Sequence, residues 1–349
     1  MNTFNATSTT HEWPIANADR TNPCIPMLIS IITPCFNEED NVELLYERVK
    51  VALSTLPKYR YEHLFIDNAS TDGTVTRIKA IAAKDRNVKL IVNCRNFGHL
   101  RSPLHAFFQA GGDAVIAMAS DLQDPPELIP EFIAKWEEGF KVVIGVKPRS
   151  RETLLMFSIR KLYYKGIGKI SDVPLIDNFT GFGLYDREVV EEVRATGDRY
   201  PYFRGLIADL GYPRAEIPFV QPQRVRGITK NNFYSLYDIA MLGITSHSKV
   251  PLRLATMAGF LLGFISLLIA MGYLLAKLLF WDNFTFGMAP LVIGLFFFAS
   301  VQLFFTGILG EYIGAIHTQV TKRPLVIEKE RINFGPANSD DNRDDNEAR

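Results

Sequence analysis

The sequence is poor in cysteine and has no excess of charge of either sign. Its three cysteines, Cys24, Cys35 and Cys94, form no C-x-x-C pair and leave one unmatched. This pattern favours reduced thiols in a cytosolic domain over a disulfide framework. The 38 basic and 38 acidic residues cancel to a formal net charge of +0. A chain without a basic excess is not expected to bind nucleic acid.

Two sequence patterns that bind phosphate are also missing. Neither G-x-G-x-x-G nor G-x-x-x-x-G-K-[ST] occurs, which excludes a dinucleotide fingerprint and a P-loop. Bound phosphates would therefore need a metal ion or side chains. Residues 1–26 are polar and contain no apolar run. We expect a disordered N-terminus there and no secretory signal peptide.

Long apolar runs are present near the C-terminus. Residues 254–280 carry one charge, Lys277, and residues 288–310 carry none. Each run exceeds the ~20 apolar residues that are needed to cross a bilayer. The link between them is too short to fold as a domain. We predict two transmembrane helices, within residues 251–312, that form a hairpin.

Basic residues flank the predicted hairpin on both sides. Lys249 and Arg253 precede or begin the first run, Lys322 and Arg323 follow the second, and the link has no basic residue. Cytoplasmic segments carry the excess of Lys and Arg, so this pattern predicts that both ends of the hairpin are cytoplasmic. The tail, residues 313–349, is then cytoplasmic, and its charged end is predicted to be disordered.

Residues 232–250 connect the hairpin to the preceding domain. Their apolar side chains repeat at helical spacing, which predicts an amphipathic helix: Phe233, Leu236, Tyr237, Ala240 and Ile244. Such a face packs either against a protein core or on a membrane surface. The position directly before a transmembrane helix favours a helix lying at the membrane interface.

Residues 27–231 alternate between strand-like and helix-like runs. The first apolar run, 28–34, is followed by a helical pattern over 38–53. Strand-like runs recur at 61–67, 88–92 and 114–120. This alternation predicts a doubly wound α/β domain with a mostly parallel sheet. Ligands of such sheets bind outside the carboxyl ends of the strands.

Polar signatures follow these strands, as that rule requires. Asp67 ends the second strand-like run, and Asp72 is better placed to cap the next helix. That assignment leaves Asp67 for a ligand. Asp121 and Asp124 follow the fourth run, with Gln123 between them. Oxygen ligands of this kind suit Mg²⁺ or Mn²⁺, although this short acidic pattern is weakly specific when it stands alone.

Taken together, these motifs resemble a known enzyme family. The segments IITPCFNEE, IDNASTDGT, RNFG and SDLQDPPE, in this order, are similar to family 2 glycosyltransferases with the GT-A fold, a Rossmann-like α/β fold. The segment 224–254 and the hairpin narrow the resemblance to polyprenyl-phosphate glycosyltransferases. This group includes dolichyl-phosphate mannose synthase-like and GtrB-like proteins. The resemblance covers residues 27–325.

The resemblance implies a membrane-bound, inverting enzyme that uses Mg²⁺ or Mn²⁺. Its donor would be a UDP- or GDP-linked sugar, and its acceptor undecaprenyl phosphate. One sugar would be transferred on the cytoplasmic face of a bacterial inner membrane, for cell-envelope glycosylation such as that of O-antigen. Family members also suggest a homo-oligomer, for which a tetramer is the candidate.

The family's functional residues can be carried over onto matching positions. The nucleotide-binding residues would be Pro34, Phe36, Asn37, Glu38, Asp67 and Ser70. Asp121 would act in catalysis and, with Gln123, bind the metal. The diphosphate would be bound by Arg204, Arg224 and Lys230. Lys147, Arg149 and Arg151 would bind the acceptor phosphate, with a solvated basic face as the alternative explanation of that run.

Two positions depart from the family pattern. The family's first metal-binding Asp falls on Ala119, and the Asp of its Gly-Asp-Phe segment falls on Gly181. Asp177 is a nearby catalytic candidate, whereas Asp186 fits a helix cap better. An ionised lipid phosphate needs no general base. Three alternatives follow: a metal held with one carboxylate fewer, diphosphate neutralised by basic residues, or binding without turnover.

Two rival functions remain at this point. A processive polysaccharide synthase would need a Q-x-x-R-W motif, and the segment QPQRV at 221–225 lacks the Trp. A non-catalytic membrane protein that binds nucleotide sugars is supported by Ala119 and Gly181. Retention of donor binding without transfer would distinguish it.

Overall fold

The computed structural model describes residues 26–147, 176, 178–198, 200, 202–222, 241–245, 248–279, 288–321 and 323–335. Several predicted features lie outside these residues. They are the N-terminus up to residue 25, most of the amphipathic segment 232–250, and the site residues Arg149, Arg151, Asp177, Arg224 and Lys230. They stay predictions.

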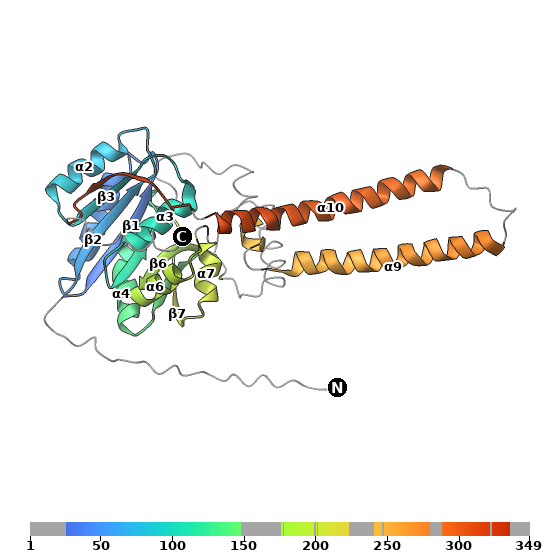
Figure 1. Ribbon diagram of the computed structural model, residues 1–349. Helices are drawn as coiled ribbons and strands as arrows, with labels where there is room; N and C mark the ends of the chain where they lie inside the picture. The colour runs from blue at the N-terminus through green and yellow to red at the C-terminus, as the bar shows by residue number, and fades with distance from the viewer. Residues whose placement is uncertain are drawn as a thin grey trace, which may run out of the picture.

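Strands and helices alternate along the first two thirds of the chain (Figure 1). The strands are β1 (Leu28–Cys35), β2 (Arg60–Asp67), β3 (Val88–Asn93), β4 (Ala114–Ala117), β5 (Val142–Val146), β6 (Phe179–Asp186), β7 (Arg214–Pro218) and β8 (Glu328–Ile332). The helices are α1 (Val42–Ser54), α2 (Thr74–Lys84), α3 (Gly98–Gln109), the 3₁₀ turn η1 (Pro126–Leu128), α4 (Ile129–Glu137), α6 (Arg187–Ala195), α7 (Phe203–Asp209), α9 (Val250–Leu279) and α10 (Met288–Val320).

The described strands form one eight-stranded sheet in the order β7-β5-β6-β4-β1-β2-β3-β8. The central strands β4, β1, β2 and β3 are parallel neighbours. β6 and β8 run antiparallel to the strands they pair with, and the remaining strands share one direction. The prediction of a mostly parallel α/β sheet is therefore confirmed, with β6 and β8 as the exceptions.

The sheet separates two apolar cores. Helices α1, α2 and α4 cover one face, through residues such as Leu45, Ile78 and Phe132. Helices α3, α6 and α7 cover the other, through residues such as Phe107 and Val190. Both layers are needed because a parallel strand is buried on its two faces. The apolar periodicity of α1, read at Val42, Leu45, Val49 and Leu53, is confirmed because all four side chains are buried.

Asp186 is a structural residue, as the helix-cap interpretation predicted. Its carboxylate accepts a hydrogen bond from the Glu188 backbone N–H at 3.0 Å and so caps α6. It also accepts one from the Trp136 indole N–H of α4 at 2.7 Å. The side chain is fully engaged in joining β6, α6 and α4, which removes it from the candidates for catalysis.

His63 is buried within β2 and gives the fold a pH dependence. Its Nε2 lies 3.0 Å from the Thr33 hydroxyl, and its Nδ1 has no hydrogen-bond partner among the described residues. Burial lowers the pKa of His63 to about 3. Below pH 6.5 the unfolded chain binds a proton at this residue that the folded chain excludes, so stability falls as the pH falls.

We expect the free energy of unfolding to drop by about 2 kcal/mol between pH 7 and pH 5 through this residue. Thermal or denaturant unfolding of the purified protein at the two pH values measures the drop. The variant His63→Gln carries no titrating ring and should lose most of the difference. An equal drop in wild type and variant would assign the pH dependence to other groups.

Helices α9 and α10 form a hairpin that extends away from the α/β domain (Figure 1). They contain the segments Val250–Ile269 and Ile293–Val320, which are long and apolar enough to cross a membrane. In the most apolar 18-residue window of each segment, no residue is buried inside the protein. At the base of the hairpin, the Tyr312 hydroxyl donates a hydrogen bond of 2.7 Å to the Ser248 carbonyl. This contact joins the beginning of α9 to α10.

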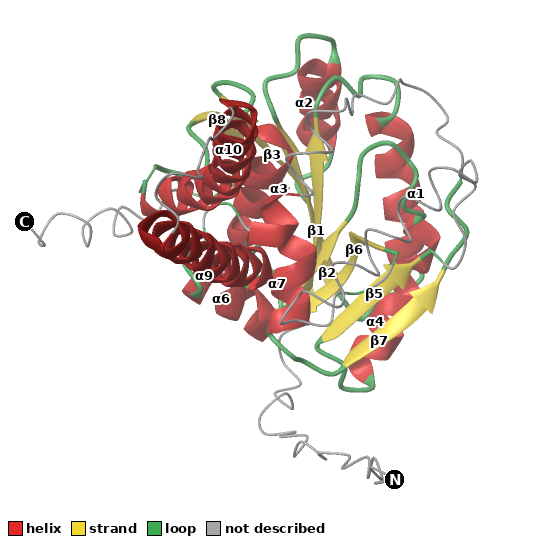
Figure 2. Cartoon of the chain, turned by 90° about the vertical axis from the view of Figure 1, so that its right-hand side faces the viewer, coloured by secondary structure: helices red, strands yellow, loops and turns green. Residues whose placement is uncertain are grey.

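Strand β8 was not predicted from the sequence. After α10, the chain returns to the domain, and Glu328–Ile332 pairs antiparallel with β3 at the edge of the sheet (Figure 2). Part of the predicted tail is therefore an integral strand of the α/β domain. After the hairpin, the chain thus returns to the same α/β domain that precedes it.

Candidate active site

The loops that follow β1 and β2 are tied together by hydrogen bonds. The Ser70 hydroxyl accepts from the Asn37 N–H at 2.9 Å, and the Asn37 side-chain oxygen accepts from the Thr71 N–H at 2.8 Å. Asn37 and Ala69 both have positive φ, 55° and 62°, so both loops turn sharply here. Asn37 and Ser70, both predicted nucleotide-binding residues, are therefore in contact and hold the two loops to each other.

A second set of bonds fixes the bases of the same loops. The Glu38 N–H donates to the Thr74 hydroxyl at 2.8 Å, and the Glu39 carboxylate accepts from the Gly73 N–H at 2.8 Å. Asp72 accepts from the Thr74 N–H at 3.0 Å, at the first residue of α2. As predicted, Asp72 is the carboxylate that supports the start of α2, whereas Asp67 makes no bond to that helix.

Asp67 is the buried carboxylate at the end of β2. Its side chain is 0% exposed, and Oδ2 accepts from the Ser70 N–H at 2.9 Å. Oδ1 has no hydrogen-bond partner among the described residues. Burial raises the pKa of Asp67, and the hydrogen bonds from Ser70 oppose this rise. A buried carboxylate oxygen without a partner is costly, so this position favours a ligand that donates an N–H or O–H.

The loop after β4 carries the acidic pattern. Asp121 is 8% exposed, and its Oδ1 accepts from the Gln123 N–H at 3.1 Å. Between them, Leu122 has a φ of 61°, which makes the turn tight. The strand β4 is a direct neighbour of β1, so Asp121 and the β1 loop lie at the same edge of the sheet. Asp67 ends β2, the next strand along, and reaches the same edge.

Asp124 is hydrogen-bonded to the backbone of this loop, a contact that the sequence did not indicate. It is 7% exposed, and its Oδ2 accepts from the Ala119 N–H at 2.9 Å. Burial raises the pKa of Asp124 to about 6; the nearby Asp121 carboxylate adds to the rise, while the Ala119 N–H and Lys147 oppose it. A carboxylate therefore lies against residue 119, the position that holds Ala in place of the family's first Asp.

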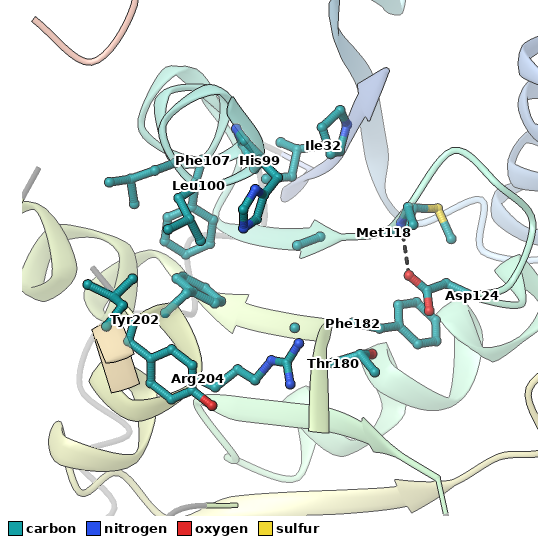
Figure 3. Close-up of a pocket in the computed structure, with 18 residues that line it drawn as sticks. Ile32, His99, Leu100, Phe107, Met118, Asp124, Thr180, Phe182, Tyr202 and Arg204 are labelled. Atoms are coloured by element: carbon teal, nitrogen blue, oxygen red, sulfur yellow. Dashed lines mark hydrogen bonds between the residues drawn. The ribbon is translucent and has the colours of Figure 1, made fainter. Parts of the chain in front are cut away.

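A cavity of about 260 Å³ opens beside this loop. Its walls come from the ends of β1 and β4, the start of β6, the first turns of α3 and α7, and Leu242 from the segment before α9. Figure 3 shows Asp124 and Arg204 entering it from different elements. Most of the lining is apolar, with Leu100, Phe107 and Phe182 among the contributors. Ala119 and Gly181 both line it, so the two departures from the family pattern meet in one place.

Arg204 contributes a guanidinium group to the lining of this cavity. It is the second residue of α7 and is partly buried. Within the described parts of the chain, its side chain has no hydrogen bond or ion pair, and its charge acts on the nearby Tyr185 hydroxyl. A guanidinium in this position suits an anionic group such as a phosphate. Lys147, at the end of β5, acts electrostatically on Asp124 and therefore lies near the same cavity.

Gly181, which stands where the family has an Asp, has a backbone conformation that favours glycine. Its φ is +102°, a conformation that residues with a side chain rarely adopt. The Tyr185 hydroxyl donates to the Gly181 carbonyl at 2.9 Å and holds the backbone in place. An Asp here would need a different backbone, so the local structure explains why this chain carries glycine. The adjacent Thr180 hydroxyl has no hydrogen-bond partner within the described ranges.

The residues of the β4 loop fit a divalent cation only in part. In the portion of the chain that the structure describes, no group of three or more His, Cys, Asp or Glu side chains is arranged to hold a metal. Asp121 and Gln123 supply oxygen donors of the type that Mg²⁺ and Mn²⁺ prefer. Mg²⁺ usually binds through one or two carboxylates together with substrate phosphates and water. Such an ion fits this loop when the substrate supplies the remaining ligands.

Several of the predicted site residues lie in the loops after β1 and β2 or line the cavity. Asn37, Glu38, Asp67 and Ser70 lie around the β1 and β2 loops. Pro34 and Arg204 line the cavity, and Phe36 continues the chain from β1 into its loop. Asp124 belongs to the acidic pattern read from the sequence, but it was not among the residues carried over as metal ligands. Nothing local in the sequence indicated that its carboxylate binds the Ala119 N–H.

Comparison with known proteins agrees with this architecture. Residues 30–194 match the Glycosyl transferase family 2 domain. A bactoprenol glucosyl transferase derived from the SfII prophage of Shigella flexneri is 36% identical over 311 residues, covering 89% of this chain and all of that protein. The chain belongs to glycosyl transferase family 2. It is therefore a glycosyltransferase, and the family resemblance drawn from its motifs is confirmed.

Other relatives of this glycosyltransferase show the same full-length similarity. An uncharacterized glycosyltransferase of Synechocystis is 34% identical over 300 residues, which cover 86% of this chain and 94% of that protein. A prophage bactoprenol glucosyl transferase homolog of Escherichia coli K12 is 33% identical over 304 residues, with coverage of 87% and 99%. The similarity thus extends beyond the matched domain and includes the apolar hairpin.

Proposed function

We propose that this glycosyltransferase moves one sugar from a nucleotide diphosphate to a polyprenyl phosphate, with undecaprenyl phosphate as the acceptor. The observation that carries the proposal is the position of the cavity. It is walled by Ala119 and Asp124 on one side and by Leu242, just before α9, on another. An acceptor held in a membrane would reach the carboxylate loop through this cavity. Full-length similarity to bactoprenol glucosyl transferases supports the same assignment.

The nucleotide would bind at the loops after β1 and β2. The Oδ1 of Asp67, which has no partner among the described residues, would accept a hydrogen bond from an N–H of the base. The Asn37–Ser70 contact would keep the two loops at a fixed spacing. Pro34, Phe36 and Glu38 complete the predicted nucleoside site. Because hydrogen bonds already hold these loops together, little conformational entropy would be lost when the nucleotide binds.

A divalent cation would be held by Asp121 and Gln123 together with the diphosphate. When bound, it neutralises charge that develops on the leaving diphosphate. Arg204 is available for the same charge or for the incoming phosphate, and Arg224 and Lys230 remain predicted diphosphate ligands. The Asp121 turn, closed by the Gln123 N–H at 3.1 Å, holds the carboxylate in place before substrate arrives.

The transfer step needs no general base. A phosphate oxygen of the acceptor would form a bond to the anomeric carbon while the bond from that carbon to the diphosphate oxygen breaks. The electron pair of the broken bond leaves with the nucleoside diphosphate, and the sugar inverts. Because the acceptor is already ionised near neutral pH, the residues' task is alignment and charge neutralisation. Lys147, Arg149 and Arg151 are the predicted acceptor-phosphate ligands.

The hairpin supports a membrane arrangement for this enzyme. With α9 and α10 crossing the inner membrane, the α/β domain and both ends of the hairpin would be cytoplasmic, in agreement with the flanking Lys249, Arg253 and Arg323. The lipid-linked product would serve cell-envelope glycosylation. Small residues on the hairpin, such as Gly259 and Gly263, leave space beside their backbones for a second helix, which is compatible with the predicted homo-oligomer.

The test is transfer from labelled UDP-, GDP- and CDP-sugars to undecaprenyl phosphate, with Mg²⁺, Mn²⁺ or EDTA present. We expect label in the lipid phase with one donor and its loss in EDTA. Transfer that persists in EDTA would contradict the metal assignment and favour neutralisation by basic side chains. The second candidate, a nucleotide-sugar binder without turnover, rests on Ala119 and Gly181. Binding of a donor with no transfer to any acceptor would establish it.

A further inference from the structure

The segment that leaves the hairpin runs along the α/β domain. We call residues 323–335 the strap. Its strand β8 pairs with β3, and the Cys94 N–H donates to the Ile327 carbonyl at 2.9 Å. Asn333 ends the strap by donating to the Ala82 and Val88 carbonyls at 2.7 and 2.8 Å. The strap is therefore fixed at both of its ends to the sheet and its helices.

The strap also follows one face of α3. Three residues of this helix, spaced four apart and hence on one face, contact it: Arg101, His105 and Gln109. Arg101 donates to the Pro324 carbonyl at the start of the strap. His105 Nε2 lies 2.5 Å from Glu328 Oε1, and the Gln109 side chain accepts from Arg331 at 2.8 Å.

The contact between His105 and Glu328 is the most enclosed of these. Their side chains are 16% and 19% exposed. Arg331 is a cationic partner of the same Glu328 carboxylate. Burial alone would raise the pKa of Glu328, but hydrogen bonds from His105 and Arg331 lower it to about 2. Glu328 is therefore ionised at neutral pH and holds α3 through a partly shielded charge.

The first turns of α3 face the cavity. His99, Leu100, Pro103 and Leu104 all line it. Arg101 and His105, on the strap side, are interleaved with them along the helix. A shift of α3 relative to the strap would therefore change the cavity wall. The strap begins directly after α10, so it connects that wall to the hairpin.

We propose that His105 and Glu328 are positioning residues for transfer to a membrane-held acceptor. They couple the exit of α10 to the helix that walls the cavity, and so set the cavity at a fixed position relative to the hairpin. This inference rests on the proposed function. A lipid acceptor presents its phosphate at a fixed depth, so its alignment depends on this coupling, whereas a water-soluble acceptor approaches freely.

The strap offers a matched control. Glu330, two residues after Glu328, pairs with Lys79 of α2 at 2.6 Å, and both side chains are about 40% exposed. Lys79 lies on a helix that does not line the cavity. The changes Glu328→Gln and Glu330→Gln are the same chemically and fall in the same edge strand. A general weakening of β8 would affect both variants.

The experiment compares both variants with wild type in lipid nanodiscs. For Glu328→Gln we expect the KM for undecaprenyl phosphate to rise about fivefold, as for a modest coupling between two sites. We expect kcat, and transfer to a short-chain water-soluble polyprenyl phosphate, to stay within about twofold. The Glu330→Gln variant should match wild type with both acceptors. Amide hydrogen exchange of residues 98–104 should speed up only in Glu328→Gln.

An equal effect of the two variants would overturn the proposal, and so would an equal loss with both acceptors in Glu328→Gln. Hydrogen exchange separates this proposal from the proposed function. If wild type transfers to neither acceptor, the function fails, yet faster exchange at 98–104 in Glu328→Gln alone would still establish the coupling. Unchanged exchange together with unchanged KM would refute it.

Discussion

Replacement of Asp121 by Asn is expected to lower sugar transfer by about 100- to 1000-fold, the range seen when one charge-stabilising group is removed. Asp121 is nearly buried, and its Oδ1 accepts from the Gln123 N–H. The Asn side chain keeps an oxygen for that bond, so the turn should persist. What is lost is the negative charge that a divalent cation needs.

Two measurements check this result. The initial rate of transfer is measured with the donor that wild type accepts, and Mn²⁺ affinity is measured by electron paramagnetic resonance in the presence of the nucleoside diphosphate. Metal affinity should fall about 10- to 100-fold. Asp209→Asn makes the same chemical change at an exposed end of α7 and should leave both values unchanged. A variant that retains wild-type transfer would exclude Asp121 as a metal ligand.

The parts of the fold that could be predicted are those that depend on residues close together in the sequence. The apolar spacing of α1 identified its buried face at Val42, Leu45, Val49 and Leu53. Asp186 was identified as a cap because it directly precedes a helical run. The two apolar runs indicated the hairpin because a single helix can satisfy its own backbone in lipid. In each case the deciding residues lie within a few turns of one another.

Strand β8 escaped prediction for a physical reason. Its residues, EKERI, include four charges, and its burial alternates between partly buried and exposed. Such a sequence has low strand propensity, and its pairing with β3 joins segments more than 200 residues apart. The side-chain contacts that hold it, such as the ion pair of Glu330 with Lys79 and the hydrogen bond between Glu328 and His105, are long-range. Charged edge strands are common, since charge protects an open sheet edge.

In the candidate site, too, local features could be predicted and long-range contacts could not. Asp67 was found from its position at the mouth of a strand, and its unpartnered Oδ1 is the kind of atom that a ligand would satisfy. The shared location of Ala119 and Gly181 in one cavity was not predictable, because β4 and β6 meet only in the folded sheet. The engagement of Asp124 with the Ala119 N–H depends on the left-handed turn at Leu122.

Ala119→Asp is expected to tighten Mn²⁺ binding by about 10- to 100-fold, because it would supply the carboxylate that this loop lacks. Ala119 is partly buried and lines the cavity beside Asp124. A third carboxylate in this loop raises the repulsion among the acids when no cation is present. A bound cation relieves that repulsion, so the gain should appear in metal affinity. Electron paramagnetic resonance with the nucleoside diphosphate present measures it.

The effect on transfer distinguishes the alternatives for this loop. If Asp121 already suffices when metal is saturating, Ala119→Asp should lower the Mn²⁺ concentration needed for half-maximal rate and leave kcat within about twofold. Ala119→Asn introduces a side chain of the size of Asp without its charge, and this variant should bind Mn²⁺ as wild type does. Unchanged affinity in Ala119→Asp would show that residue 119 does not face the cation. Transfer that appears only in Ala119→Asp would show that the natural chain binds its donor without turning it over, because the loop then lacks a carboxylate that the chemistry requires.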